Sequence, residues 1–388
     1  MSYTAETYSL LSVGKIVAGP NSIEAVKDIA VDTGVQKVLI ITDQGVWNAG
    51  LIDKPMSILK EQGVQVTVIN STPPEPDVEQ VNQIFQEAKA SDCQMIIGIG
   101  GGSSIDVAKI VAVMLKNDVS LRELLKAPKI TKRGIPTLMI PTTAGTGAEV
   151  TPNAIVLVPE DELKVGIVSE KMMPDYIILD PLMTLNLPKA ITASTGMDAL
   201  AHAIECYISK KANPFSDTFA LKAINLIARS IRTAYNNGQD IEARHDMLLG
   251  AMLGGLCIAT SSTVAVHALA YPLGGKYRIP HGLSNAILLP HVMKFNMDAA
   301  AEKFKNMAVA MDLKVAGLSA HQAAEKMIEN LYSLISDLNI QVNLQEKGIS
   351  ENNIDSMAEA ALKVTRLLNN NPKAMNKDDI KAIYKKLF

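Results

Sequence analysis

The first half of the chain alternates short β-branched runs with amphipathic stretches of helical length, and this alternation limits the possible folds more than any other feature. Strands separated by helices of this length are typical of a parallel sheet in an α/β domain. The runs expected to form strands are residues 37–42, 64–69, 94–99, 136–140, 154–158 and 177–179. The stretches 52–62 and 78–91 lie between them and are expected to be helices.

After about residue 189 the pattern changes to long helical stretches with few β-branched clusters. These stretches are residues 216–234, 241–259, 299–311, 319–338 and 354–367. A length of 388 residues favours two domains, and prolines break the pattern between Asp180 and Pro188. We therefore predict an α/β domain over residues 1–184 and an all-helical domain over residues 185–388.

The charge balance excludes some kinds of partner. Lys and Arg number 37 against 40 Asp and Glu, so no basic excess indicates nucleic acid or a membrane surface. Three scattered cysteines and the lack of a secretory signal favour a cytoplasmic protein. Residues 247–275 carry no charge and are long enough to span a bilayer, which takes roughly 20 apolar residues. Their polar patch at 260–263 favours a buried helix in a soluble domain instead.

A glycine-rich segment follows the third expected strand and opens a helix expected over residues 105–115. It reads Gly100, Gly101, Gly102 and Ser103 after Gly98 and Ile99. Glycines allow close approach of a ligand, and a helix N-terminus offers free N–H groups and a positive dipole end, which together suit a pyrophosphate. Ser103 stands where a GxGxxG motif would have its last glycine, so a tight strand–helix turn without a ligand is the alternative.

Two further polar features follow expected strands. Asp43 ends the first strand, where a carboxylate can bind a ribose 2′-OH and repel a 2′-phosphate, so it favours NAD over NADP. A helix N-cap is the alternative for this residue. Thr142, Thr143 and Thr146 follow the fourth strand, and ligands of open α/β sheets bind at such carboxyl ends. A polar loop without a ligand is the alternative there.

The helical half contains all six histidines, and some of them suggest a metal site. Asp198 and His202 are four residues apart in a segment, 194–205, that is expected to start a helix, so they share one face. His267 lies in the charge-free run, and His281 follows Pro280 at an expected helix N-terminus. One carboxylate and three imidazoles suit Fe²⁺ or Zn²⁺ better than Mg²⁺ or Ca²⁺. An Asp198–His202 hydrogen bond and satisfied core histidines are the alternatives.

Several segments together resemble the iron-containing (group III) alcohol dehydrogenases. In chain order they are Gly100–Lys109 (GGGSSxDxAK), Thr142–Glu149 (TTAGTGAE), Gly196–Tyr207 (GxDALxHAIExY), Val266–Gly275 (VHALAxPLGG) and Pro280–Val292 (PHGxxNAILLPHV). The resemblance covers nearly the whole chain. It implies a Rossmann-like α/β N-terminal domain and an all-α C-terminal domain, as in dehydroquinate synthase-like proteins, with the active site in the cleft between them.

The resemblance also implies roles for individual residues. The implied metal ligands are Asp198, His202, His267 and His281. The implied cofactor-binding residues are Asp43, Gly100, Gly101, Gly102, Ser103, Asp106, Thr142, Thr143, Thr146 and Lys164. The implied cofactors are NAD and Fe²⁺, with Zn²⁺ or another divalent ion as alternatives. A homodimer or larger homo-oligomer is expected, because family members commonly form such assemblies.

The chain departs from the family pattern in two places. Where the family commonly has a second histidine four residues after the one at 267, this chain has Tyr271, so we expect Tyr271, beside His267, to handle the alcohol proton. A phenol with a pKa of about 10 is a weaker proton relay near neutrality. Where family members often read N-x-G-L-G, this chain has Thr260–Val264.

The predicted function is a metal-dependent, NAD(H)-linked alcohol dehydrogenase or aldehyde reductase, in which the metal acts as a Lewis acid on the substrate oxygen. The substrate is expected to be a small aldehyde. An anionic one is favoured if Lys276 or Arg278 faces the site, and the alternative is that both are solvated loop charges. The alternative functions are a dehydroquinate-synthase-like lyase and a non-catalytic metal or nucleotide binder.

Overall fold

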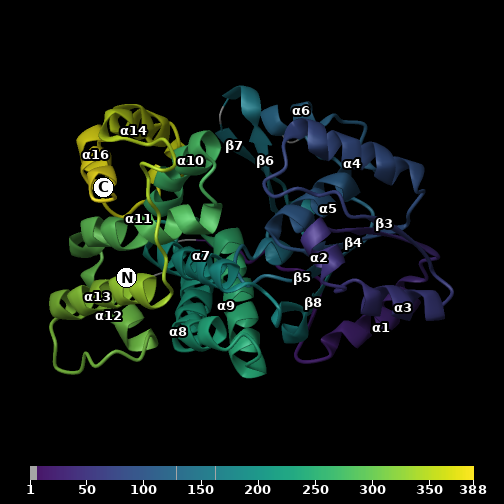
Figure 1. Ribbon diagram of the computed structural model, residues 1–388, viewed down its shortest axis with the longest axis horizontal. Coiled ribbons are helices and arrows are strands. Elements are labelled where there is room, and N and C mark those ends of the chain that lie inside the picture. The colour runs from purple at the N-terminus through teal and green to yellow at the C-terminus, as the bar shows by residue number, and fades with distance from the viewer. Residues whose placement is uncertain (1–6, 128, 162) are drawn as a thin grey trace. The chain divides into compact units, whose positions relative to one another are not determined.

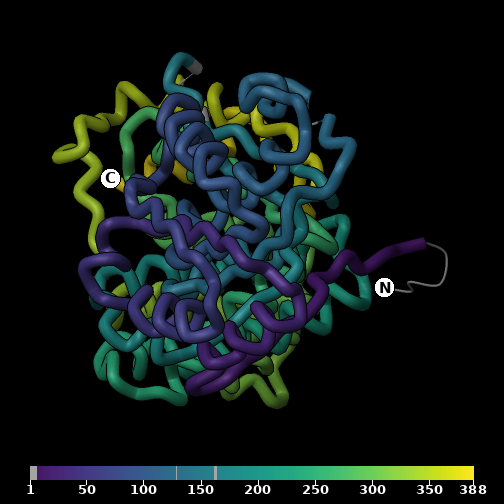
Figure 2. Tube along the Cα trace, turned by 90° about the vertical axis from the view of Figure 1, so that its right-hand side faces the viewer, coloured from purple at the N-terminus to yellow at the C-terminus, as the bar shows by residue number. Residues whose placement is uncertain are grey.

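The computed structural model describes residues 7–127, 129–161 and 163–388. The chain forms two compact units. We call residues 11–187 with 239–248 the sheet unit, and residues 7–10, 188–238 and 249–388 the helical unit. The helix that begins at residue 241 starts in the first and continues in the second. In Figure 2 the Cα trace is coloured from purple near the N-terminus to yellow at the C-terminus.

The sheet unit is built on six parallel strands in the order β1-β8-β5-β4-β2-β3. The strands are β1 (Lys15–Ala18), β2 (Lys37–Ile41), β3 (Gln65–Ile69), β4 (Met95–Gly100), β5 (Thr137–Pro141) and β8 (Tyr176–Leu179). The two central strands β4 and β5 are buried along their whole length, as expected for a sheet covered on both faces. The predicted parallel α/β sheet is therefore confirmed.

Helices cover both faces of this sheet. The helices of the sheet unit are α1 (Val26–Thr33), α2 (Gln44–Asn48), α3 (Asp53–Glu61), α4 (Val78–Ala90), α5 (Gly102–Met114) and α6 (Leu121–Lys126), of which α6 packs against α4. Alternate strand residues such as Ile40 and Ile97 form one core with α1 and α3. The helix α5 packs along β4 and β5, as Figure 1 shows. Because side chains alternate along a strand, the remaining buried residues, such as Leu39 and Ile96, face the opposite side.

One expected strand does not join the main sheet. Residues 154–158 were expected to continue the parallel pattern, but β6 (Asn153–Val158) pairs antiparallel with β7 (Leu163–Val168) in a separate two-stranded sheet. Alternate residues of β6 are buried, which is typical of a hairpin with one covered face. The short strand β1 was not predicted, since its four residues are mostly exposed at the edge of the sheet.

The helical unit confirms the all-helical second half. Its helices are α7 (Lys189–Ile208), α8 (Pro214–Asn236), α9 (Ile241–Thr260), α10 (Ala265–Tyr277), α11 (His281–Asn296), α12 (Ala301–Ala310), α13 (Ala320–Asp337), α14 (Ile354–Leu362), α15 (Thr365–Leu368) and α16 (Lys377–Lys385). The C-terminal helix α14 packs against α10, and α16 packs against α14 (Figure 1). The short helix α15 also packs against α10. The stretch expected as one helix over 354–367 is two helices.

One predicted boundary in this unit was wrong. The segment 194–205 was expected to start a helix, but α7 already begins at Lys189, so Asp198 and His202 lie in its interior. Hydroxyl residues such as Thr195 are more common at helix ends than in helix interiors. In the structure the Thr195 hydroxyl donates to the Ile191 carbonyl oxygen (2.7 Å), which keeps it inside the helix.

In the part of the chain that the structure describes, no single helix is long and apolar enough to cross a membrane. The helices α9 and α10 pass that test only as a pair, and they meet at an angle of 103°.

Candidate metal centre and nucleotide site

Three helices of the helical unit carry the expected metal ligands. Asp198 and His202 lie one turn apart in α7, His267 is in the first turn of α10, and His281 is the first residue of α11. The spacing of four residues in α7 places both side chains on one face of that helix. The interior of α7, the first turn of α10 and the first residue of α11 thus supply the four side chains.

A tight turn between α10 and α11 brings His267 and His281 together. Arg278 follows the last residue of α10 in a left-handed conformation (φ 53°). The Arg278 and Ile279 N–H groups donate to carbonyl oxygens of Gly274 and Leu273, each at 3.2 Å, which closes the helix end. The chain then reverses at once into α11.

The four side chains form one cluster. Their ligand atoms lie within 4.8 Å of one another. The Nε2 atoms of His202, His267 and His281 are 3.9, 3.8 and 3.8 Å from Asp198 Oδ1, respectively. The rings of His202 and His267 stack with their centroids 4.6 Å apart. The structure therefore brings together all four residues that sequence motifs indicated.

The charge on Asp198 is maintained although the residue is buried. Burial alone would raise its pKa, but His202, His281, His267 and the Asn285 amide act in the other direction and lower the pKa of Asp198 to about 2. The carboxylate is therefore ionised at neutral pH, as a metal ligand must be.

Glu205 is a functional residue that the sequence reasoning missed. Its side chain is fully buried in α7, and its Oε1 accepts hydrogen bonds from the Val264 (3.1 Å) and Val266 (2.6 Å) N–H groups at the start of α10. Its Oε2 bonds to His267 Nδ1. This contact turns His267 Nε2 toward Asp198, in the arrangement by which carboxylates orient metal-bound histidines. A lone acid three residues after His202 in an apolar helix was the available signal.

These residues fit a transition-metal ion. One ionised carboxylate and three imidazole nitrogens make an N₃O set, and the buried Glu205 fixes which nitrogen of His267 faces the cluster. The set suits Fe²⁺ or Zn²⁺.

Asn285 adds a polar group that no sequence pattern had singled out. It lies one turn after His281 on α11 and is fully buried. Its Nδ2 donates to Asp198 Oδ1 (2.6 Å) and lies 3.1 Å from His267 Nε2 and 3.2 Å from His281 Nε2. Its position four residues after His281 was the only hint in the sequence.

The expected nucleotide residues gather at one edge of the sheet unit. Strand order reverses between β2 and β4, because β3 lies outside β2 while β5 lies on the other side of β4. Asp43 follows β2 and Gly100–Gly102 follow β4, so both flank this switch point, which is where open α/β sheets bind ligands. Thr142, Thr143 and Thr146 follow the neighbouring strand β5.

Close contacts join these segments. A methyl group on Gly102 would lie 2.7 Å from Thr146 Cγ2, and one on Gly101 would lie 3.5 Å from Thr143 Oγ1. The loop therefore requires glycine at 102, where the backbone meets Thr146. The helix α5 starts at Gly102, three residues earlier than predicted, so its N-terminal N–H groups lie at this glycine segment.

Asp43 has the N-cap role that was considered for it, and its ribose-binding role stays a prediction. Its Oδ1 accepts from the Val46 N–H (2.9 Å) and caps α2, as the alternative predicted. Its Oδ2 lies 3.4 Å from the Ser104 hydroxyl, beside the glycine segment.

The other expected cofactor residues interact with protein groups. Ser103 Oγ accepts from the Glu75 N–H (3.1 Å), and Lys164 Nζ donates to Glu75 Oε1 (2.6 Å). Asp106 is mostly buried, accepts from the Ile155 N–H (2.9 Å), and forms an ion pair with Lys109 at 3.0 Å. Asp106 therefore connects α5 to β6.

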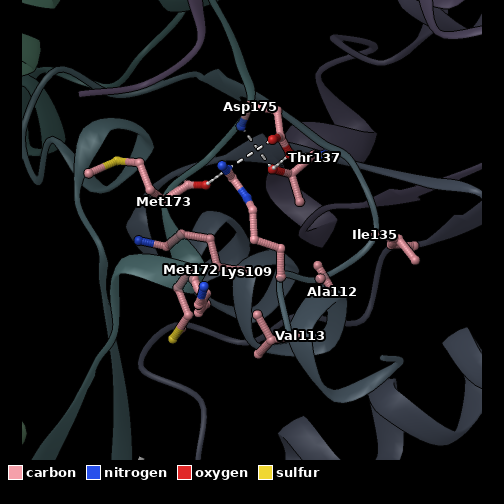
Figure 3. Close-up of a pocket in the computed structure, with 11 residues that line it drawn as sticks. Lys109, Ala112, Val113, Ile135, Thr137, Met172, Met173 and Asp175 are labelled. Atoms are coloured by element: carbon pink, nitrogen blue, oxygen red, sulfur yellow. Dashed lines mark hydrogen bonds and ion pairs between the residues drawn. The ribbon is translucent and has the colours of Figure 1, made fainter. Parts of the chain in front are cut away.

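A small pocket at the opposite edge of the sheet does not involve the expected site residues. It is lined by residues of α5 and by residues at or just before the starts of β5 and β8, including Thr137, Met173 and Asp175 (Figure 3). Arg133 donates to the Met173 carbonyl oxygen (2.8 Å) and to Asp175 Oδ1 (2.9 Å), and Asp175 Oδ2 accepts from the Thr137 N–H (2.9 Å). The bond between Thr137 and Asp175 links the start of β5 to the residue before β8.

The departures from the family pattern lie close to the metal centre. Tyr271 follows His267 by one turn of α10. Burial raises the pKa of Tyr271, against the opposing effect of the Arg366 guanidinium. The phenol is therefore protonated at neutral pH.

The polar segment between α9 and α10 uses its hydroxyls within the protein. Ser261 Oγ donates to the Cys206 carbonyl oxygen (3.2 Å), and Ser262 Oγ to that of Thr263 (2.8 Å).

The chain is similar to known proteins over nearly its whole length. Residues 14–181 match the family described as iron-containing alcohol dehydrogenase, and residues 192–388 match the Fe-containing alcohol dehydrogenase family, C-terminal. The 1,3-propanediol dehydrogenase of Klebsiella pneumoniae is 37% identical over 390 residues, which cover 100% of both chains. A solved structure of 1,3-propanediol oxidoreductase has a TM-score of 0.94 at 36% identity, covering 99% of this chain and 100% of that one. Sulfoacetaldehyde reductase from Bifidobacterium kashiwanohense, solved in complex with NAD⁺, has a TM-score of 0.89 at 27% identity, covering 99% of each.

Proposed function

The chain belongs to the iron-containing alcohol dehydrogenase family, and from this premise we propose how its own residues support NAD(H)-linked alcohol oxidoreduction. Asp198, His202, His267 and His281 hold the divalent metal. The observation that carries this assignment is the single buried cluster of their ligand atoms, with His267 fixed by Glu205. Iron is the family's metal, and the same N₃O set also accepts Zn²⁺.

The nucleotide is held at the switch point of the sheet. Gly100–Gly102 and the start of α5 bind the pyrophosphate, for which the free N–H groups and the dipole of the helix are suited. Asp43 Oδ2 accepts from a ribose hydroxyl, and Thr142, Thr143 and Thr146 line the adjacent loop. Ser103 and Lys164 act through Glu75, and Asp106 holds α5 against β6.

When bound, NAD(H) exchanges a hydride with the substrate carbon, while the metal polarises the substrate oxygen. The protein's part is to hold that oxygen and its proton. Asp198 lowers the net charge of the centre, and Glu205 keeps His267 oriented. Tyr271, one turn from His267, carries the alcohol proton through its hydroxyl. Because its pKa is raised, it acts as a hydrogen-bonded relay and not as a phenolate base.

The metal assignment is tested by metal analysis and NADH oxidation on anaerobically prepared protein. We expect one Fe²⁺ per chain and turnover of short aldehydes in the wild type. His267→Ala is expected to lose both, and His291→Ala, which removes a histidine bonded to Tyr332 outside the centre, to keep both. Full metal content in His267→Ala would refute the ligand assignment.

The substrate is a small aldehyde, and we propose that it carries an anionic group. Lys276 and Arg278, considered from the sequence, are both exposed, and Lys276 Nζ lies over the Tyr277 ring (5.8 Å). Arg366 of α15 is exposed as well, but its charge lowers the pKa of Tyr271, an effect that neither Lys276 nor Arg278 has. A guanidinium whose charge acts on Tyr271 suits a substrate with a carboxylate, sulfonate or phosphonate group.

This finer proposal is tested with an anionic and a neutral aldehyde of equal length. A charge-assisted hydrogen bond contributes about 1.5–3 kcal/mol, so Arg366→Ala is expected to raise KM for the anionic aldehyde about 10-fold or more. KM for the neutral aldehyde should change little, and Lys276→Ala should affect neither. Equal effects of Arg366→Ala on the two aldehydes would contradict the proposal.

We further propose a cytoplasmic homodimer or larger homo-oligomer. Cys93, Cys206 and Cys257 are free thiols, which fits a reducing compartment. Light scattering of the purified protein tests the assembly state, and a monomer would refute it.

A further inference from the structure

Asn285 occupies an unusual place for an amide. Its side chain is 0% exposed, and its terminal nitrogen faces three of the four proposed ligand atoms. Each of those atoms presents a lone pair to the cluster when it binds a cation. A cation held by these atoms would meet the hydrogens of the amide nitrogen, which repel it.

The distances are those between neighbouring ligands of one ion. Two atoms bound to an ion at about 2.1 Å and at right angles to each other lie about 3.0 Å apart. The amide nitrogen of Asn285 lies 2.6 Å from Asp198 Oδ1, 3.1 Å from His267 Nε2 and 3.2 Å from His281 Nε2. An atom at this position is therefore placed as a further ligand, provided that it has a lone pair.

The oxygen of the same amide meets that condition. The oxygen and nitrogen ends of a carboxamide have nearly the same shape, and a half-turn of the amide exchanges them. Asn285 Oδ1 is buried and has no hydrogen-bond partner among the described residues, so the half-turn breaks no bond at that end. Full burial of the side chain favours this half-turn over departure from the cluster.

We propose that Asn285 is a fifth protein ligand of the metal, bound through Oδ1 after a half-turn of its amide. This inference rests on the proposed function, because it requires the ion held by the four other residues. The resulting N₃O₂ set favours Fe²⁺, which accepts five or six ligands, over Zn²⁺, which favours four. Asn285 thus contributes to metal selectivity as well as to affinity.

The test uses Co²⁺ as a spectroscopic probe, together with Fe²⁺ and Zn²⁺ affinities, in the full chain. Five-coordinate Co²⁺ absorbs more weakly in the visible range than four-coordinate Co²⁺. Wild type is expected to give the weak spectrum, and Asn285→Ala the strong one. Asn285→Ala is also expected to lose about 10-fold or more in Fe²⁺ affinity and less in Zn²⁺ affinity.

Two further variants separate ligation from folding. Asn285→Asp keeps an oxygen at this position, so it is expected to restore the weak spectrum and Fe²⁺ binding. Asn296→Ala removes another fully buried amide of α11, one that is hydrogen-bonded to Asn371, and should leave the spectrum and the affinities unchanged.

The possible failures are distinguishable. A wild type that binds one metal ion while Asn285→Ala keeps its spectrum and affinities overturns only the role of Asn285. A wild type that binds no Fe²⁺, Zn²⁺ or Co²⁺ overturns the four-residue centre, and with it this inference.

Discussion

Glu205 is the buried group on which the orientation of His267 depends. Its two carboxylate oxygens accept from His267 Nδ1 and from two N–H groups that begin α10. No solvent reaches this carboxylate, and its three bonds all point to donors. A group that only accepts hydrogen bonds is required at this position.

Glu205→Gln should therefore weaken metal binding. The Gln amide nitrogen would face at least one of the N–H donors that now bond to Glu205. His267 would then lose its fixed orientation. We expect a loss in metal affinity of about 10- to 100-fold, measured by competition with a chelator. Glu149→Gln, which changes a buried carboxyl group of the sheet unit, is the matched control and should leave the affinity unchanged. Wild-type affinity in Glu205→Gln would contradict the orienting role.

The sequence predicted those members of the site whose residue type alone indicates metal binding. Asp198, His202, His267 and His281 are types that bind metals, and they stand in recognisable motifs. Glu205 and Asn285 lie in the same motifs, but a carboxylate in a helix is usually a solvated charge, and an amide is usually a surface group. Their roles depend on burial, and burial follows from how α7, α10 and α11 pack, which local sequence does not specify.

Element boundaries were predicted least well where polar residues lie inside helices. The sequence near Thr195 suggested a helix start, yet the hydroxyls bond back to the preceding turn. The hairpin β6–β7 was also missed, since Asn153–Val158 has the composition of the parallel strands. The strand β6 differs from the parallel strands because it pairs antiparallel with β7.

The contact between α7 and α11 depends on a glycine. A methyl group on Gly282 would lie 2.4 Å from the Ser194 carbonyl oxygen and 3.3 Å from Asp198 Cβ. Gly282→Ala is therefore expected to push α11 away from α7 and to move His281 away from Asp198. We expect a loss of about 1–3 kcal/mol in the free energy of unfolding and weaker metal binding. Urea unfolding and chelator competition measure the two effects.

Gly254→Ala is the control for this variant. Gly254 also lies beside a ligand helix, but its added methyl group would be 3.4 Å from the Ala199 carbonyl oxygen and 3.5 Å from His202 Cβ, which are ordinary contacts. Removing a glycine from a helix interior stabilises it by roughly 0.5–1 kcal/mol. If both variants behaved alike, close packing at Gly282 would not be the cause.

The junction of α5 with the loop after β5 contains a titratable group that affects stability. Burial raises the pKa of Glu149 from 4.5 to about 7, against the weaker opposing effects of a backbone hydrogen bond and of Lys109. Because the folded-state pKa lies above the unfolded value, the stability contribution is complete below pH 4.5 and is lost as the pH rises through 7. Lys109 itself is held by Asp106 and by the Ala148 carbonyl oxygen (2.8 Å).

Glu149→Gln should remove this pH dependence. Between pH 5 and pH 8 the wild type is expected to lose stability relative to the variant, by on the order of 3 kcal/mol. Urea unfolding across this range measures the difference. Parallel pH profiles of the two proteins would show that Glu149 is not held neutral by the fold.

At the scale of the whole molecule, the proposed metal and nucleotide residues belong to different units. Asp198, His202, His267 and His281 all lie in the helical unit, and Asp43, Gly100–Gly102 and the loop after β5 lie in the sheet unit. The domain boundary near residue 184 stays a prediction; the sheet unit ends at residue 187, residues 7–10 belong to the helical unit, and residues 239–248 return to the sheet unit. The local sequence does not mark the point at residue 248 where the chain passes from one unit to the other, because α9 continues without a break across it.

Each ligand added alone should therefore protect a different part of the chain against hydrogen exchange. A ligand at 1,000 times its Kd stabilises the folded state that binds it by about 4.1 kcal/mol. Metal without nucleotide is expected to slow exchange in α7, α10 and α11, and NAD⁺ without metal to slow it in the loops after β2, β4 and β5. His267→Ala should abolish the first effect and keep the second, because its sheet unit is unchanged. Protection of the same segments by both ligands would mean that the two proposed sites are not assigned to the right units.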